Sequence, residues 1–339
     1  MAKLASFGAY VPLYRLARQR IGEAWGIPAV PGERAVANAD EDSLTMAVAA
    51  GLDCLAGIDP STIDGLFFAT TTAPYSEKQS AGVIAAALDL RHDINTADFT
   101  GSLRAATTAL RAAADAIDSG NARSILVTAA DCRLGEPESM WEQLLGDGAG
   151  AVLVSKEGPV AIQAAYSVAG EQVGPWRRAE DRYLRSFEAR AETQFGYAVG
   201  VVEAGKALME KEGVTANDIA KAVISAADPR SHAGVGRALG FQPSQLQALN
   251  LPLGTTSASA GTFAVGGHYD TPVGNIVIDQ VTYLPETSFG PAATARDLSG
   301  VSSLIGQGGR PLKVVVHCRD GTIGGGRQLE VEFGIRFGL

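Results

Sequence analysis

The sequence predicts an α/β fold built from two duplicated halves, and three observations support this. Its 339 residues, 46% of them hydrophobic and 19% charged, can bury a large core without disulfide bonds. One order of elements occurs twice, with Ile63 aligned to Ile219 and Phe68 to Ile224. Apolar strands alternate with amphipathic helices, which is typical of parallel sheets covered on both faces. We therefore expect two halves related by a pseudo-twofold axis.

The elements of the first half follow from local patterns. Residues 42–72 predict an N-capped helix, a turn and a buried strand that ends in three threonines. Residues 96–120 predict a strand end, a glycine turn and a helix. Residues 124–133 predict another buried strand, which a Gly-rich turn joins to the strand in "GDGAGAVLVS".

The second half repeats this order. Residues 200–228 again predict a helix, a turn and a strand, and 257–266 align with the helix start at 101–110. The strand at 312–320 resembles the one at 124–133. The repetition indicates that each half is one α/β unit.

The two helix-opening turns, 100–104 and 254–258, are expected to converge on one pocket at the carboxyl ends of the strands. The expected division is an N-terminal half (1–160), a cap or insertion (161–199) and a C-terminal half (200–339) with an atypical segment at 264–310.

Composition excludes several functions. The net charge is −9 and no block of Lys and Arg occurs, so nucleic acid is not expected as a partner. Three scattered cysteines without a CxxC pair predict a reduced, cytoplasmic protein rather than a disulfide framework or a cysteine zinc site. The N-terminus lacks a signal-peptide pattern, and no apolar run reaches the ~20 residues of a membrane span.

Several motifs occur in an order and spacing that resemble the 3-hydroxy-3-methylglutaryl-CoA synthase branch of the thiolase superfamily, close to ketoacyl synthase III. They are "SFGAYVPLYRL", "GERAVANADEDSLTMA", "TTTAPYSEK", the turn at 101, "LVTAADCRLG" and "GDGAGAVLV". The resemblance implies a thiolase-like, five-layered αβαβα fold, an oligomer and chemistry on acyl-CoA thioesters. It implies acyl-CoA as a ligand and no covalently bound cofactor.

The resemblance also implies a Cys nucleophile surrounded by Glu, His and Asn, and this sequence departs from that set. Leu103 stands at the nucleophile's position, Thr71 at that of the Glu, Ser225 (or Ala226) at that of the His and Thr255 at that of the Asn. Leucine cannot attack a thioester, although a helix start favours a thiolate there. A threonine hydroxyl cannot relay protons near neutral pH as a carboxylate can.

These replacements predict a pseudoenzyme kept for its architecture. Related assemblies pair an inactive synthase-like subunit with a thiolase-like subunit and a small OB-fold, zinc-ribbon protein. The resemblance therefore implies a homodimer, or a heteromer with such partners. The alternative is an active acyl-CoA condensing acyltransferase with replaced catalytic residues.

That alternative has weak candidate nucleophiles. Ser102 precedes Leu103, but a serine needs an adjacent base, and an N-cap is the simpler interpretation. Cys318 follows His317 and precedes a Gly-rich turn, "DGTIGGG", which resembles the one after a catalytic Cys in degradative thiolases. A buried strand, whose adjacent side chains face opposite ways, explains that pair as well.

The segment 264–300 departs from the family pattern and contains a hairpin-like stretch, "NIVIDQVTYLP". His268, Asp270 and Asp297 are candidate zinc ligands, and a metal-dependent hydrolase is a further alternative. Loop-forming Asx turns are the simpler interpretation, so no metal is expected. His92 and His232 are expected at the surface.

Residues 166–195 are rich in Arg, Glu and aromatic residues, and they predict either a cap over the pocket, a partner contact or a solvated helix. Arg177, Arg178 and Arg182 are candidates for binding the phosphates of CoA. Residues 94–101 are expected to form an edge strand through which two subunits associate.

Overall fold

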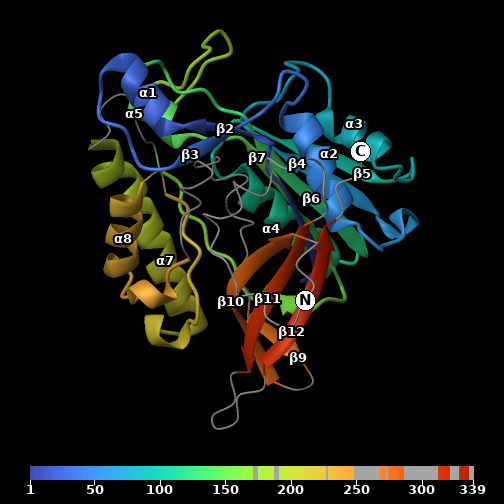
Figure 1. Cartoon of the computed structure of the whole chain (residues 1–339). Coiled ribbons are helices and arrows are strands. Elements are labelled where there is room, and N and C mark those ends of the chain that lie inside the picture. Colours follow the sequence, from blue (N-terminus) through green and yellow to red (C-terminus); the bar gives the residue numbers. More distant parts are fainter. Residues whose placement is uncertain are drawn as a thin grey trace.

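A computed structural model describes residues 1–170, 175–186, 191–226 and 228–247, and four further strands up to residue 335. A six-stranded sheet occupies the centre of the first part (Figure 1). In spatial order its strands are β5 (Asn95–Phe99), β4 (Gly65–Ala69), β6 (Ser124–Asp131), β7 (Gly148–Ser155), β1 (Lys3–Tyr10) and β8 (Val160–Ala161).

The sheet is mixed. β5, β4 and β6 run parallel, whereas β7, β1 and β8 pair antiparallel with their neighbours. The prediction of mainly parallel strands is therefore right for one side of the sheet and wrong for the other. The connection from β6 to β7 contains one helix, α5 (Met140–Leu144), about 7 Å long. This helix cannot carry the chain back along β6, an eight-residue strand about 26 Å long, so β7 returns antiparallel.

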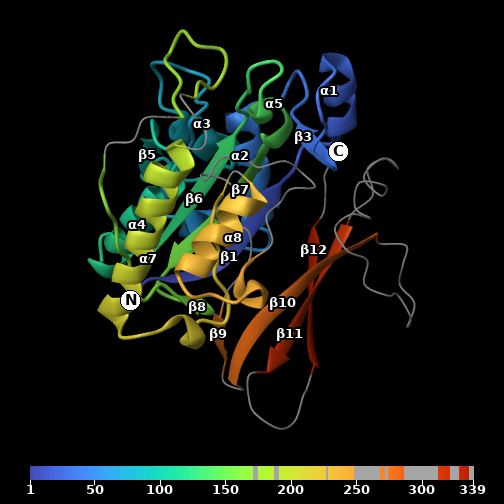
Figure 2. The same cartoon turned by 90° about the vertical axis from the view of Figure 1, so that its left-hand side faces the viewer.

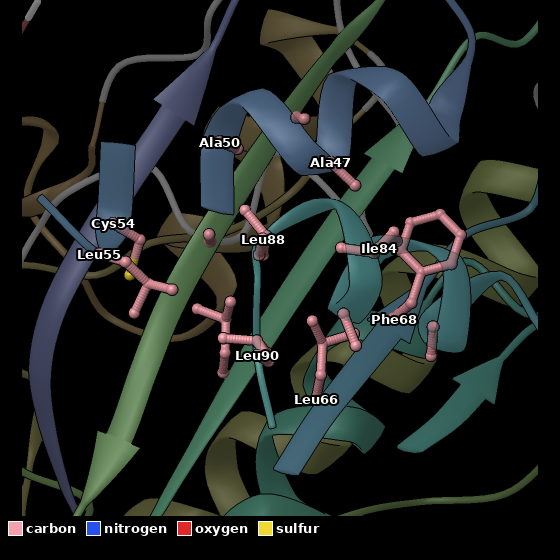
Figure 3. Packing of buried hydrophobic residues seen from close by; sticks show 14 of the residues in the cluster. Ala47, Ala50, Cys54, Leu55, Leu66, Phe68, Ile84, Leu88 and Leu90 are labelled. Atoms are coloured by element: carbon pink, nitrogen blue, oxygen red, sulfur yellow. The ribbon is translucent and has the colours of Figure 1, made fainter. Parts of the chain in front are cut away.

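Helices cover both faces of the sheet, as the apolar strands predict. The first face packs against α2 (Ser43–Cys54) and α3 (Ser80–Ala87), and Figure 3 shows Leu66 and Phe68 of β4 beneath these helices. The second face packs against α4 (Ala105–Asp118), whose buried side chains are mostly alanines. All eight residues of β6 are buried, because alternate side chains enter one core or the other.

Local chemistry sets the start of α2. The Asp42 carboxylate accepts from the Thr45 backbone N–H at 2.8 Å, and the Thr45 hydroxyl accepts from the Asp42 N–H at 2.8 Å. This reciprocal pair is a capping box. The N-capped helix predicted from residue 42 is thereby confirmed.

Two elements of the predicted repeat, a helix and the turn after it, occur in both halves. In the first half α2 precedes a 3-10 turn, η1 (Pro60–Thr62); in the second, α7 (Ala198–Glu212) precedes η3 (Ala216–Asp218). The prediction of a strand at the end of 200–228 is wrong. Among the described residues, this segment pairs with another only at an isolated β-bridge between Ala222 and Leu246. An extended segment forms a β-strand only when a neighbouring strand pairs with it through a series of backbone hydrogen bonds.

The C-terminal strands form an antiparallel sheet rather than a second parallel unit. Its order is β12 (Gln328–Ile335), β11 (Leu312–Asp320), β10 (Gly274–Pro285) and β9 (His268–Thr271). The strand predicted at 312–320 is confirmed. The stretch at 275–285, which was interpreted as hairpin-like, lies within a single continuous strand, β10. β9 lies beside β8 (Figure 2). The turn at 254–258 lies outside the described residues.

In the described part of the chain, no helix is long and apolar enough to cross a bilayer. The remaining elements flank the sheets. They are β2 (Tyr14–Ala17), α1 (Arg18–Trp25), β3 (Glu33–Val36), η2 (Glu192–Tyr197), α8 (Pro229–Ala238) and η4 (Pro243–Gln245). β5 is the outermost strand of the six-stranded sheet, so the edge position predicted for 94–101 is confirmed.

Candidate active site

Three segments meet at the carboxyl ends of β5, β4 and β6. In the parallel register, Ala69 lies opposite Phe99 on one side and Ala129 on the other. The residues just beyond these positions therefore share one edge of the sheet. They are the threonines at 70–72, the turn at 100–104 and the segment at 131–133.

The turn at 100–104 opens α4 and holds the position predicted for a nucleophile. Gly101 adopts a left-handed conformation with φ 73°, which glycine tolerates best. Leu103 is half-buried. The Ser102 hydroxyl accepts from the Arg104 backbone N–H at 3.2 Å, and Arg104 is itself the N-cap. Ser102 therefore shapes the turn. The interpretation of Ser102 as the N-cap is wrong, because Arg104 holds that position.

The hydroxyl of Thr71 is committed to a buried carboxylate. Asp131, the last residue of β6, is fully buried. Its Oδ1 accepts from the Thr71 N–H at 2.6 Å and from the Thr71 hydroxyl at 2.8 Å. The hydroxyls of Thr70 and Thr72 donate to the same oxygen at 3.1 and 3.3 Å. The three threonines thus bind one carboxylate and join the ends of β4 and β6.

Arg133 is the second buried charge at this edge. Burial raises the pKa of Asp131 and lowers that of Arg133, while the attraction between the two groups opposes both shifts. Asp131 Oδ2 and Arg133 Nε and Nη1 have no hydrogen-bond partner in the described structure. Both residues belong to the motif "LVTAADCRLG", from which no role for them was predicted. The available signal was two charged residues at the end of an otherwise apolar strand.

A hairpin from the predicted cap covers this edge. Trp176 and Arg185 exchange backbone hydrogen bonds of 3.0 and 2.8 Å, and the Leu184 N–H donates to the Leu134 carbonyl at 2.8 Å. Arg177 Nη2 then donates to the Thr71 carbonyl at 2.8 Å. This hairpin, residues 175–186, therefore places one arginine directly at the strand ends.

The other two arginines predicted to bind CoA phosphates have different surroundings. The Arg178 backbone N–H donates to Asp181 at 3.0 Å, and the Arg182 guanidinium lies over the Tyr183 ring, 5.4 Å from its centroid. Both residues are exposed. Of the three, Arg177 alone has a described contact with the strand ends.

The two family positions in the second half, Ser225 and Thr255, have no described contact with the Asp131 network. The Ser225 carbonyl accepts from the Tyr197 hydroxyl at 2.7 Å, and Thr255 lies outside the described residues. His92 is exposed, as predicted, but His232 is 7% exposed, so its expected surface location is wrong. His232 is one of the buried residues of α8, together with Val235 and Gly236, and burial lowers its pKa.

The described thiols are unsuited to attack. Cys54 and Cys132 are free, and burial is the main reason that the pKa of each rises, to about 12 and about 11. Cys318 and its neighbour His317 lie in β11, opposite Ile278 and Gln280 of β10. A strand position was the simpler interpretation of this pair.

The possible metal ligands are only partly described. His268 and Asp270 lie on β9, and Asp297 falls outside the described residues. Within the described residues, no group of three or more His, Cys, Asp or Glu side chains is arranged to hold a metal ion.

Known proteins are similar to this chain in sequence. The 3-oxoacyl-[acyl-carrier-protein] synthase III model matches residues 97–170. Hydroxymethylglutaryl-CoA synthases of Pyrococcus furiosus and Thermococcus gammatolerans are 33% and 34% identical over 244 residues, 70% of this chain and 69% of each relative.

Solved structures agree on the fold. The 3-oxoacyl-[acyl-carrier-protein] synthase III of Aquifex aeolicus is 23% identical with a TM-score of 0.68, covering 78% of this chain and 89% of its own. A variant of Xanthomonas campestris OleA is 16% identical with a TM-score of 0.69, covering 77% and 86%. The chain belongs to the hydroxymethylglutaryl-CoA synthase family, in the branch of the thiolase superfamily close to ketoacyl synthase III.

Proposed function

We propose that this chain is a non-condensing member of its acyl-CoA condensing family and acts as a structural subunit of an acyltransferase or thiolase complex. The observation that carries the proposal is Leu103 at the opening turn of α4. The family resemblance assigns a cysteine nucleophile to this position. A leucine side chain offers no lone pair to a thioester carbonyl, so no acyl-enzyme can form there.

The surroundings of Leu103 support the same proposal. Thr71, at the position of the acid/base Glu, donates its hydroxyl to Asp131. Ser102 accepts a hydrogen bond from the backbone of its own turn, and no described hydrogen bond joins it to a base. A serine without a base remains a weak nucleophile. We infer a cytoplasmic location, in keeping with the free thiols of Cys54 and Cys132.

The first test of this proposal is acylation. Incubation of the full chain with acetyl-CoA or acetoacetyl-CoA, followed by intact-mass spectrometry, should show the unmodified 35.0 kDa chain. The variant Leu103→Cys should show no condensing activity, because Thr71 supplies no carboxylate for proton transfer. A stoichiometric adduct on Ser102 or Cys318 of the wild type, or condensation by Leu103→Cys, would contradict the proposal.

We also propose that β5 joins this chain to a second subunit, in a homodimer or in a heteromer with a thiolase-like subunit and a small OB-fold, zinc-ribbon protein. β5 pairs with β4 on one side and leaves its other edge open in the described structure, and a free edge invites strand pairing. Light scattering after size-exclusion chromatography should show a dimer at micromolar concentration. A monomer of 35.0 kDa that gains neither partner when they are added would refute the subunit role.

A further inference from the structure

Arg133 is a buried cation with unused hydrogen-bond donors. The residue is 7% exposed, and its Nε and Nη1 have no hydrogen-bond partner in the described structure. Buried donors of this kind are rare in folded proteins, and leaving a charged group unsatisfied is costly. An acceptor from outside the chain would remove that cost.

The nearest described carboxylate does not fill this role. Asp131 Oδ1 is occupied by the threonine donors, and its Oδ2 has no partner, so Asp131 and Arg133 make no hydrogen bond through these atoms. The other buried acid nearby, Asp147, accepts from the Ala37 N–H at 2.8 Å and is electrostatically coupled to Arg34. Neither acid neutralises the donors of Arg133 by direct contact.

A second guanidinium, that of Arg177, lies at the same strand ends. Arg177 is exposed, is held by the Thr71 carbonyl, and is close enough to Arg133 for the two positive charges to repel each other. The buried Asp131 charge offsets part of this repulsion, and a further anion that reaches both guanidinium groups would be attracted by both. The guanidinium group matches the planar geometry of a carboxylate.

We propose that Arg133 and Arg177 together bind a carboxylate at the carboxyl ends of β4 and β6. Arg177, on the hairpin, meets the anion first, and Arg133 receives it from the buried side. The carboxylate belongs either to the end of an acyl group or to a free dicarboxylate. This site does not depend on whether the chain condenses acyl groups.

Calorimetric titration of the full chain tests the site. Succinyl-CoA, which ends in a carboxylate, is compared with acetyl-CoA, which does not, and free succinate is compared with inorganic phosphate. Charge-assisted hydrogen bonds predict about 10- to 100-fold tighter binding of succinyl-CoA than of acetyl-CoA. Binding of free succinate without this preference would identify the free dicarboxylate as the ligand.

Matched variants separate the site from general charge. Arg177→Ala should abolish the preference for the carboxylate, whereas Arg182→Ala removes the same charge from the same hairpin and should keep it. Arg133→Met should also abolish the preference for the carboxylate. Because this substitution is buried, thermal unfolding of the variant is measured as well. If Arg133→Met fails to fold, the surface variant Arg177→Ala decides the test. The proposal is overturned if the wild type binds no carboxylate, if phosphate binds as tightly as succinate, or if Arg177→Ala keeps the preference.

Discussion

Replacement of Asp131 by alanine is expected to lower the free energy of unfolding by about 3–5 kcal/mol, the range for removing one member of a buried charged network. The change leaves the donors of Thr70, Thr71 and Thr72 without their shared acceptor. It also leaves Arg133 without the one buried carboxylate whose charge opposes its burial. Urea unfolding followed by circular dichroism would measure the loss.

Two control variants make this result specific. Asp131→Asn keeps an oxygen acceptor and should lose less stability than Asp131→Ala. Asp118, whose side chain is 46% exposed, forms an ion pair with the N-terminal amino group. Asp118→Ala removes this exposed pair, so it should change the free energy of unfolding by at most about 1 kcal/mol. If Asp131→Ala costs no more than Asp118→Ala, the threonine network contributes little to the fold.

Replacement of Gly8 by alanine is expected to cost about 3 kcal/mol, the upper end of the usual range for overpacking. A Cβ atom at Gly8 would lie 2.3 Å from the Cys54 nitrogen and 2.4 Å from the Ala50 oxygen. Both atoms belong to the backbone of α2, so the clash cannot be relieved by rotating a side chain. Since β1 and α2 would have to separate, thermal and urea unfolding should both report the loss.

The matched control is the same substitution at another glycine. Gly82 lies in α3, and a Cβ there would meet only the flexible Gln79 side chain, at 3.4 Å. Gly82→Ala should therefore stabilise the chain by about 0.5 kcal/mol, because alanine restricts the unfolded chain. Equal effects of the two substitutions would show that the close approach of β1 to α2 is not a constraint on the fold.

Local sequence patterns predicted six main elements of the first half, which are α2, β4, β5, α4, β6 and β7. Helix starts such as Asp42 depend on side chains three residues apart, and buried strands such as β6 depend on an unbroken apolar run. These signals are local, so the sequence predicts them without knowledge of the rest of the molecule. The replacement of the family's nucleophile by Leu103 was likewise visible from the motif alone.

Other features depend on contacts between distant parts of the chain. They are the antiparallel direction of β7, the failure of 219–226 to form a ladder and the burial of His232. The tertiary structure also decided the role of Asp131 and Arg133. Periodicity indicates which side chains turn toward a core, but not which distant groups they meet there. Asp131 accepts a hydrogen bond from Thr71, 60 residues earlier in the chain, and the charge of Arg177, from the hairpin at 175–186, acts on Arg133. Such contacts arise when parallel strands end at one edge and a distant segment folds over it, because packing brings together residues that no local pattern connects.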